Sequence, residues 1–186
     1  MTFIRITLLA AFIASIGSIG SVGVAQAEDL KILVFDVNRI LVESKAGKSI
    51  GEQAQKMQSN FQDEIKSLQE KYKGKAEKLS EQRTLIAPDV LQSRVEELQI
   101  EQRRDERKMT AEVDSIRAGV TEAQRKLLEV AEKGLDKVAK KRQADLVLRR
   151  ESLYFTSPSL DVTKEVVAYV NKELPRIKVT PITKEK

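Results

Sequence analysis

The feature that most constrains this chain is an eleven-residue repeat of apolar side chains between residues 50 and 79. The matching positions are Ile50, Phe61 and Tyr72, then Ala54, Ile65 and Ala76, then Met57, Leu68 and Leu79. Such a repeat has about 3.67 residues per turn, close to the natural α-helix, so the apolar stripe winds only gently to the right. A heptad repeat would wind to the left instead. The repeat predicts a long, nearly straight helix from about residue 48 to about residue 83.

A second long helix is predicted after a break at Pro88. Proline disrupts a helix interior but fits its first turn, so the chain is expected to reverse near residues 84–89. The apolar stripe of the second helix, expected over about 89–142, contains Leu91, Val95, Leu98, Met109, Val113, Val120, Leu127, Ala131, Leu135 and Val138. Its stretch EQRRDERK, residues 101–108, has no apolar residue, which predicts weak contact there.

These helices are too long to surround one core. At 1.5 Å per residue they would extend roughly 55 Å and roughly 80 Å. They are therefore expected to project as an antiparallel helical-hairpin arm formed by residues 45–142.

Segments with the pattern of β-strands flank the arm. Residues 30–37, LKILVFDV, are apolar on both faces until Asp36, as in a strand that is covered on both sides. After the arm, two short strands are predicted around Leu146 and Leu148 and around Leu153 and Phe155, joined by a tight turn at 150–152. Asp161 is the expected N-cap of a closing helix that stops at Pro175. Residues 175–186 are predicted to be flexible or extended.

The first 27 residues have the pattern of a secretory signal peptide. Arg5 precedes an apolar run from Ile6 to Ile16, and Ala25-Gln26-Ala27 supplies a small-residue cleavage pattern. The alternative is an uncleaved membrane anchor, which the interspersed glycines and serines disfavour. We therefore expect an exported protein that begins at Glu28.

The composition excludes several kinds of site. The chain has no cysteine, histidine or tryptophan, so disulfides, thiolate or imidazole catalysis and the common zinc sites are excluded, and no catalytic, metal or cofactor site is predicted. Without Arg5 the mature chain has 32 basic and 28 acidic side chains, a formal charge of +4. A mildly basic surface attracts acidic unfolded chains, anionic lipid or nucleic acid, and export makes nucleic acid the least expected partner.

The predicted fold is mainly α with a small β body, made by residues 28–44 and 143–174. A body of 49 residues without disulfides or metal buries too little surface to be comfortably stable alone. Its three-stranded sheet would also have open edges. We therefore predict that sheets from several protomers join into one closed, barrel-like body. The residues expected to form it are Ile32, Val34, Phe35, Leu146, Leu148, Leu153 and Phe155.

Two segments of the body resemble a known family. KILVFDVNRILVESKAGKSI, residues 31–50, and DLVLRRESLYFTSPSLDVTKEV, residues 145–166, are similar to the Skp/OmpH family of periplasmic chaperones. The resemblance covers essentially the whole mature chain and departs in the tail after Leu174 and at Arg149-Arg150. It implies a jellyfish-shaped homotrimer in a Gram-negative periplasm, whose arms enclose a cavity. The implied activity is an ATP-independent holdase, which captures unfolded outer-membrane β-barrel proteins before insertion.

The arm tip is where we expect such unfolded clients to bind. Between residues 71 and 94 the basic side chains outnumber Glu77, Glu81 and Asp89, so the tip is predicted to be positively charged. The candidate client-binding residues are Lys71, Lys73, Lys75, Lys78, Arg83, Leu85, Ile86 and Arg94. Leu85 and Ile86 either staple the tip or contact a client or membrane.

The sequence leaves one further partner and two alternative functions open. The resemblance also implies contact with lipopolysaccharide through basic residues, but no motif in this sequence identifies which residues would make it. The alternative functions are a structural envelope coiled coil without chaperone activity, and a secreted nucleic-acid binder, for which an aromatic platform is lacking.

Overall fold

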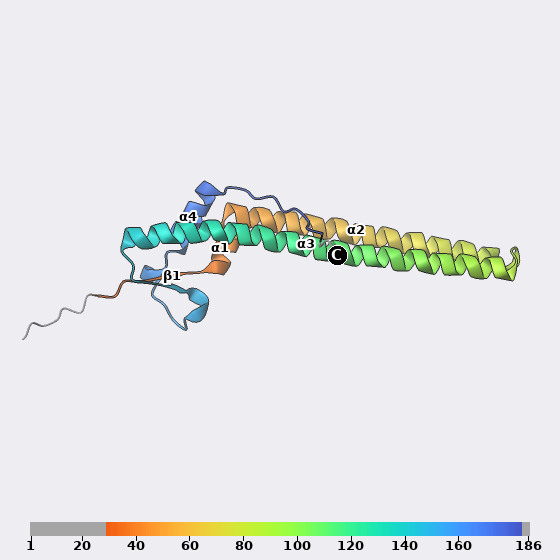
Figure 1. The fold of residues 1–186 in the computed structure, drawn as a ribbon, viewed down its shortest axis with the longest axis horizontal. Coiled ribbons are helices and arrows are strands. Elements are labelled where there is room, and N and C mark those ends of the chain that lie inside the picture. Colours follow the sequence, from red (N-terminus) through yellow and green to blue (C-terminus); the bar gives the residue numbers. More distant parts are fainter. Residues whose placement is uncertain (1–28, 184–186) are drawn as a thin grey trace, which may run out of the picture.

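The computed structural model describes residues 29–183, which form a long helical hairpin projecting from a small α/β body (Figure 1). Strand β1 (Ile32–Phe35) and helix α1 (Val37–Glu43) precede the hairpin. The hairpin consists of α2 (Lys45–Glu81), the short 3₁₀ turn η1 (Gln82–Thr84) and α3 (Pro88–Arg142). After it come β2 (Leu146–Arg149), the 3₁₀ turns η2 (Arg150–Ser152) and η3 (Pro158–Leu160), and α4 (Thr163–Glu173). The two predicted long helices are confirmed, and the predicted signal peptide lies outside the described residues.

Local sequence signals set the helix ends. Pro88 occupies the first turn of α3, where its missing N–H costs nothing. Ser44 caps α2, because its Oγ accepts a 3.0 Å hydrogen bond from the Gly47 N–H. At the other end of α3 the chain leaves through Gln143, which has a left-handed backbone (φ 54°). Lys140, Lys141 and Arg142 fill the last turn of α3, where positive charge suits the helix dipole.

The sheet connects the two ends of the hairpin. β1 and β2 pair in parallel, with Ile32 opposite Leu146 and Phe35 opposite Arg149. A parallel pair needs a long crossover connection, and here the crossover contains the whole arm. The segment before α4 lies on the other edge of β1. There the Val162 N–H donates a 2.9 Å hydrogen bond to the Val34 carbonyl, whereas the Lys31 carbonyl faces β2 and accepts from Asp145 and Leu146. The expectation that a sheet begun before the arm resumes after it is confirmed.

The predicted third strand around Leu153 and Phe155 is wrong. Residues 150–152 form η2 instead, and the segment that follows has no strand geometry in the described chain. The Leu153 N–H donates to the Arg150 carbonyl at 3.1 Å, and the Arg150 Nη1 donates to the Leu153 carbonyl at 2.7 Å. Both backbone groups of Leu153 are therefore used inside the turn and do not pair with a neighbouring strand.

The closing helix α4 begins close to its predicted position. Val162, not Asp161, flanks its first residue, but the Asp161 Oδ1 accepts a 2.8 Å hydrogen bond from the Thr163 N–H. The helix ends at Glu173, before Pro175, as predicted. It packs so closely on α3 that a Cβ at Gly134 would lie 2.5 Å from the Tyr169 ring. This contact fixes α4 on the base of the arm.

The core lies where the arm meets the body, and it extends beyond the predicted body. Its buried members are Leu33, Ile40, Ala46, Ile50, Ala123, Leu127, Ala131, Val138, Val162, Val166, Val170 and Val179. Six of these belong to α2 and α3, so the boundaries at 44/45 and 142/143 pass through the core. Because the arm helices supply part of the core, the body does not have to be stable as a separate unit of 49 residues. Its small size is therefore weaker support for assembly than the sequence suggested.

Beyond its base the arm is only two helices thick. No side chain between residues 51 and 118 is buried, and those of the eleven-residue repeat are half-buried except Ile50, which is buried, and Ala76, which is exposed. A pair of helices covers each apolar stripe from one side only. The stripe therefore remains accessible along the flanks of the arm.

Candidate functional site

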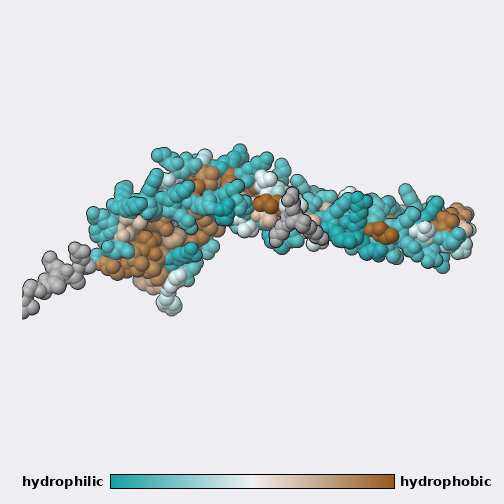
Figure 2. Space-filling view, viewed as in Figure 1, coloured by the Kyte–Doolittle hydropathy of each residue, from teal (hydrophilic) through white to brown (hydrophobic). Residues whose placement is uncertain are grey.

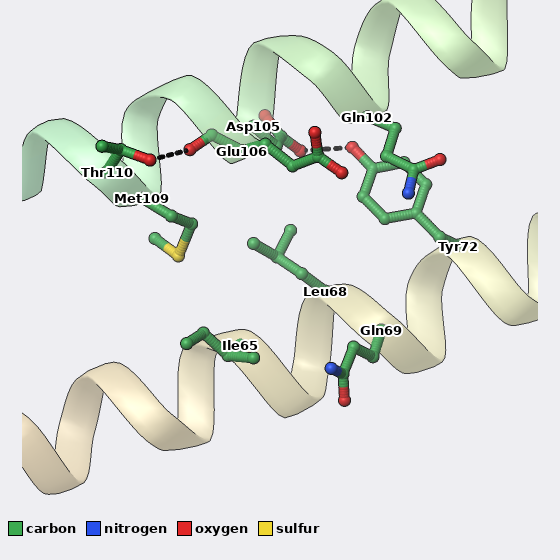
Figure 3. A pocket seen from close by; sticks show the side chains of 9 residues that line it. All are labelled: Ile65, Leu68, Gln69, Tyr72, Gln102, Asp105, Glu106, Met109 and Thr110. Atoms are coloured by element: carbon green, nitrogen blue, oxygen red, sulfur yellow. Dashed lines mark hydrogen bonds between the residues drawn. The ribbon is translucent and has the colours of Figure 1, made fainter.

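One hollow of the arm lies between α2 and α3 and is open to solvent. Figure 3 shows Ile65, Leu68 and Tyr72 reaching toward Met109 and Asp105 on the opposite helix. Gln69, Gln102, Glu106 and Thr110 complete the lining, and the hollow has a volume of about 500 Å³. Its floor is apolar, whereas its rim is polar.

Two further hollows continue the first toward the body. One, of about 670 Å³, shares Ile65 with it and contains Phe61 and Val113. The other, of about 510 Å³, shares Ala54 and Val120 with the second and reaches α1. We call the three together the arm groove, which follows α2 from Gly47 to Tyr72. At 1.5 Å per residue that is roughly 40 Å.

Glutamines are the commonest polar residues at the rim of the arm groove. They are Gln58, Gln62, Gln69, Gln102 and Gln124. A side-chain amide both donates and accepts hydrogen bonds, so it can pair with the backbone of any polypeptide sequence. An apolar floor adds attraction without directional demands. The groove is therefore chemically suited to shallow, sequence-tolerant contact with a polypeptide.

A polar network crosses the arm at the far end of the groove. The Lys71 Nζ lies 2.7 Å from the Glu101 Oε1 and 3.3 Å from the Asp105 Oδ2, and Lys75 also pairs with Glu101. The Tyr72 hydroxyl donates a 2.6 Å hydrogen bond to Asp105. Both carboxylates come from the run 101–108, which lacks apolar residues. This part of the arm, predicted to make weak contact, is held by polar interactions instead.

The network shifts the proton affinities of its members. Hydrogen bonds from Lys71 and then Lys75 lower the pKa of Glu101. The hydrogen bond from Tyr72 is the main cause that lowers the pKa of Asp105. Partial burial, followed by the bond to Asp105, raises the pKa of Tyr72 to about 12. Both carboxylates therefore stay charged to lower pH than usual.

The network also changes the charge expected at the tip. Glu101 and Asp105 of α3 lie across from Lys71 and Lys75, although they follow Arg94 in the sequence. Residues 71–105 contain eight basic and seven acidic side chains, a net charge of +1 instead of the +3 counted over residues 71–94. The sequence count missed these partners because their proximity depends on the register of the hairpin.

The remaining candidate residues of the tip are more accessible. Arg94 donates a 2.7 Å hydrogen bond to Gln82, and Lys73 lies 4.0 Å from Glu77. In the described part of the chain, Lys78 and Arg83 make no ion pair. Leu85 is 81% exposed and does not staple the tip, whereas Ile86 is half-buried.

A second apolar surface lies on the body. Figure 2 shows apolar side chains gathered over the body, while the visible face of the arm is mostly hydrophilic. Phe155 is 80% exposed, Tyr154 is fully exposed, and Leu30 and Leu146 are also exposed. Exposed aromatic side chains in a short loop are typical of an interaction surface. We call Leu30, Leu146, Tyr154 and Phe155 the body patch.

The structure separates the residues predicted to form the oligomeric body. Leu146 and Phe155 belong to the body patch, and Ile32, Phe35, Leu148 and Leu153 are half-buried. Val34 is buried within the chain, so its side chain is not available on the surface for contact with another copy. Tyr154 was missed, because the predicted strand alternation placed it on the polar face. Its aromatic neighbour Phe155 was the available signal.

Two other kinds of site are absent from residues 29–183. Within that range, acidic side chains form no group that could hold a metal ion. None of the helices in this part of the chain is long and apolar enough to cross a membrane.

A small α/β body that carries a long, grooved helical hairpin defines a class of arm-bearing proteins. The sequence pattern of the family described as outer membrane protein (OmpH-like) matches residues 31–170, three quarters of the chain. The chain belongs to this OmpH-like, or Skp-like, family.

A solved structure has the same fold. It is a candidate outer membrane chaperone (OmpH-like) from Caulobacter crescentus CB15, with a TM-score of 0.78 and 18% sequence identity. The match covers 84% of this chain and 92% of the other. The comparison with curated protein sequences finds no match.

Proposed function

We propose that this protein is an ATP-independent periplasmic holdase that captures unfolded outer-membrane β-barrel proteins and prevents their aggregation before membrane insertion. The observation that carries the proposal is the arm groove, an open apolar floor with an amide-lined rim. A holdase must bind many sequences weakly and release them without fuel, which favours many shallow contacts over one deep pocket. Membership of the OmpH-like family supports the choice of clients and of compartment.

We further propose that three copies assemble through their bodies, so that the arms enclose a cavity. The body patch supports this, because Tyr154 and Phe155 would remove large apolar surfaces from water on association. Among the described residues the sheet has two strands and the outer edge of β2 is unpaired, which favours pairing between copies. Size-exclusion chromatography with light scattering tests the proposal. Three times the chain mass is expected, and a stable monomer would contradict it.

The proposed activity is tested by diluting a urea-unfolded membrane barrel into buffer with and without the protein. Suppression of light scattering without added nucleotide is expected. If aggregation proceeds unchanged, a structural envelope coiled coil becomes the better account. Contact of the tip with anionic lipid or lipopolysaccharide through Lys78 and Arg83 remains a secondary proposal, which co-sedimentation with vesicles would test.

A further inference from the structure

The C-terminal segment after α4 lies against the base of the arm. It is extended and runs along α2 and α3 (Figure 1). Gln53 and Ser49 on α2 and Ser115 and Gly119 on α3 contact it. On both helices these positions lie on the flank opposite to the residues of the arm groove, such as Gln58 and Thr121. The tail therefore occupies a separate site, which we call the Gln53 crevice.

Gln53 binds the backbone of the tail with both ends of its amide. Its Nε2 donates a 2.8 Å hydrogen bond to the Ile177 carbonyl, and its Oε1 accepts a 3.0 Å bond from the Val179 N–H. The same Nε2 also donates to the Ser49 carbonyl at 2.9 Å, which fixes the side chain on its own helix. The amide thus pairs with the tail as a peptide group of a neighbouring β-strand would.

The remaining polar contacts also involve the backbone of the tail. The Ile182 N–H donates to the Ser115 carbonyl at 2.9 Å, and the Ser49 Oγ lies 3.4 Å from the Ile177 carbonyl. Gly119 permits the approach, because a Cβ there would lie 2.3 Å from the Thr180 carbonyl oxygen. Hydrogen bonds to backbone groups do not depend on the sequence that is bound.

Side chains of the tail contribute in an alternating pattern. Val179 is 2% exposed and Ile177 is half-buried, while Lys178 and Thr180 between and after them are exposed. An extended chain turns every second side chain to the same face. The site therefore holds an extended segment with aliphatic residues at alternate positions, a pattern also typical of strands from membrane β-barrels.

We propose that the Gln53 crevice is a second polypeptide-binding site, for extended segments with aliphatic side chains at alternate positions, and that the tail occupies it as an internal competitor. The tail follows α4 directly, and so short a tether gives a high effective concentration, in the millimolar range. An external segment must outcompete this. The inference that clients compete with the tail rests on the proposed holdase function. The inference that the site binds extended polypeptide does not.

The first experiment uses a chain that ends at Leu174 and a fluorescent peptide with the sequence of residues 175–183. Fluorescence anisotropy should show that the peptide binds the shortened chain at least tenfold more tightly than the intact chain, in which the site is filled. In the shortened chain, Gln53→Ala should weaken binding about tenfold, because two backbone hydrogen bonds are lost. Gln55→Ala, at an exposed position of α2 that lines no part of the arm groove, is the matched control and should leave binding unchanged. Equal binding to shortened and intact chains would overturn the proposal.

The second experiment keeps the chain intact and therefore does not depend on whether the shortened chain folds. The protein has no cysteine, so Val179→Cys provides a single thiol that reports on the tail. Its reaction with a maleimide should be slow and should accelerate at least tenfold with Gln53→Ala or with excess tail peptide. A rate that neither change affects would show that the tail is not displaced and would overturn the proposal.

Adding an unfolded barrel to the Val179→Cys chain separates this proposal from the proposed function. Faster labelling is expected if clients enter the crevice. One outcome would be that the peptide accelerates labelling, whereas the barrel leaves labelling unchanged and still aggregates. In that case the Gln53 crevice proposal holds and the holdase proposal fails. If the barrel is protected but neither barrel nor peptide changes the labelling rate, the crevice proposal fails alone.

Discussion

The Tyr72 hydroxyl, on α2, donates a 2.6 Å hydrogen bond to Asp105, on α3. The bond crosses the arm where the apolar stripe of α3 is interrupted, and Tyr72 also walls the far end of the arm groove. One residue thus links the two helices and closes the groove. The stability of the arm and its binding surface are coupled at this position.

Removing only the Tyr72 hydroxyl should loosen the arm without affecting assembly. In Tyr72→Phe the ring still packs, but Asp105 loses a partner. Amide hydrogen exchange in residues 68–76 and 101–109 should become severalfold faster, while the oligomeric mass stays the same. Unchanged exchange would mean that the hydrogen bond does not hold the helices together.

Acid should open the same part of the arm. The pKa values of Glu101 and Asp105 are lowered by their partners, so folding is favoured by both charges above their usual values of 4.5 and 3.8. That contribution is lost as the pH falls through the lowered values. Exchange protection of the arm relative to the body should therefore decrease below about pH 4.

The double variant Glu101→Gln, Asp105→Asn is the control for this pH dependence. Its arm should be less protected at pH 7 and should change little between pH 5 and pH 3. If it responds to acid as the unmodified protein does, other carboxylates are responsible.

Assembly should depend on the body patch and not on the arm. Phe155→Asp places a charge on an exposed side chain and should abolish the trimer while helicity is retained. Leu68→Asp should loosen the arm and leave the oligomer intact. Phe35→Asp should also prevent assembly, but Phe35 packs on the core, so this variant loses stability too. A trimer that persists in Phe155→Asp would exclude the patch as the contact.

Salt should weaken client capture through the accessible basic residues of the tip. Replacing Lys73, Lys78, Arg83 and Arg94 by glutamine should reduce the difference in client affinity between low and physiological ionic strength. Replacing Lys71 and Lys75 should change arm stability more than salt dependence, because both pair with Glu101. Capture that is indifferent to salt in the unmodified protein would contradict the electrostatic contribution.

The two long helices and α4 could be predicted because their signals are local. Helix α1 (Val37–Glu43) was not predicted, because its first residue was included in the preceding strand. The eleven-residue repeat and Pro88 are enough to define α2, α3 and the reversal between them. The strand at residues 32–35 was also visible from its apolar run. Each of these depends on residues close in the sequence.

The features that the sequence did not show depend on distant contacts. Glu101 and Asp105 become partners of Lys71 only through the register of the hairpin. Leu153 has the pattern of a strand, yet its backbone groups bond to Arg150 within a turn. The hydrogen bond between Gln53 and Val179 joins residues separated by more than 120 positions. No local pattern in the tail predicts this contact.

The most direct test of the account is the dilution of a urea-unfolded barrel with the intact protein and with Ile65→Glu, which places a charge where two hollows of the arm groove meet. Both proteins should be trimeric. The intact protein should suppress aggregation without nucleotide, and the variant should require at least severalfold more protein for the same effect. Aggregation unaffected by the intact protein, or equal protection by the variant, would contradict a holdase that acts through this groove.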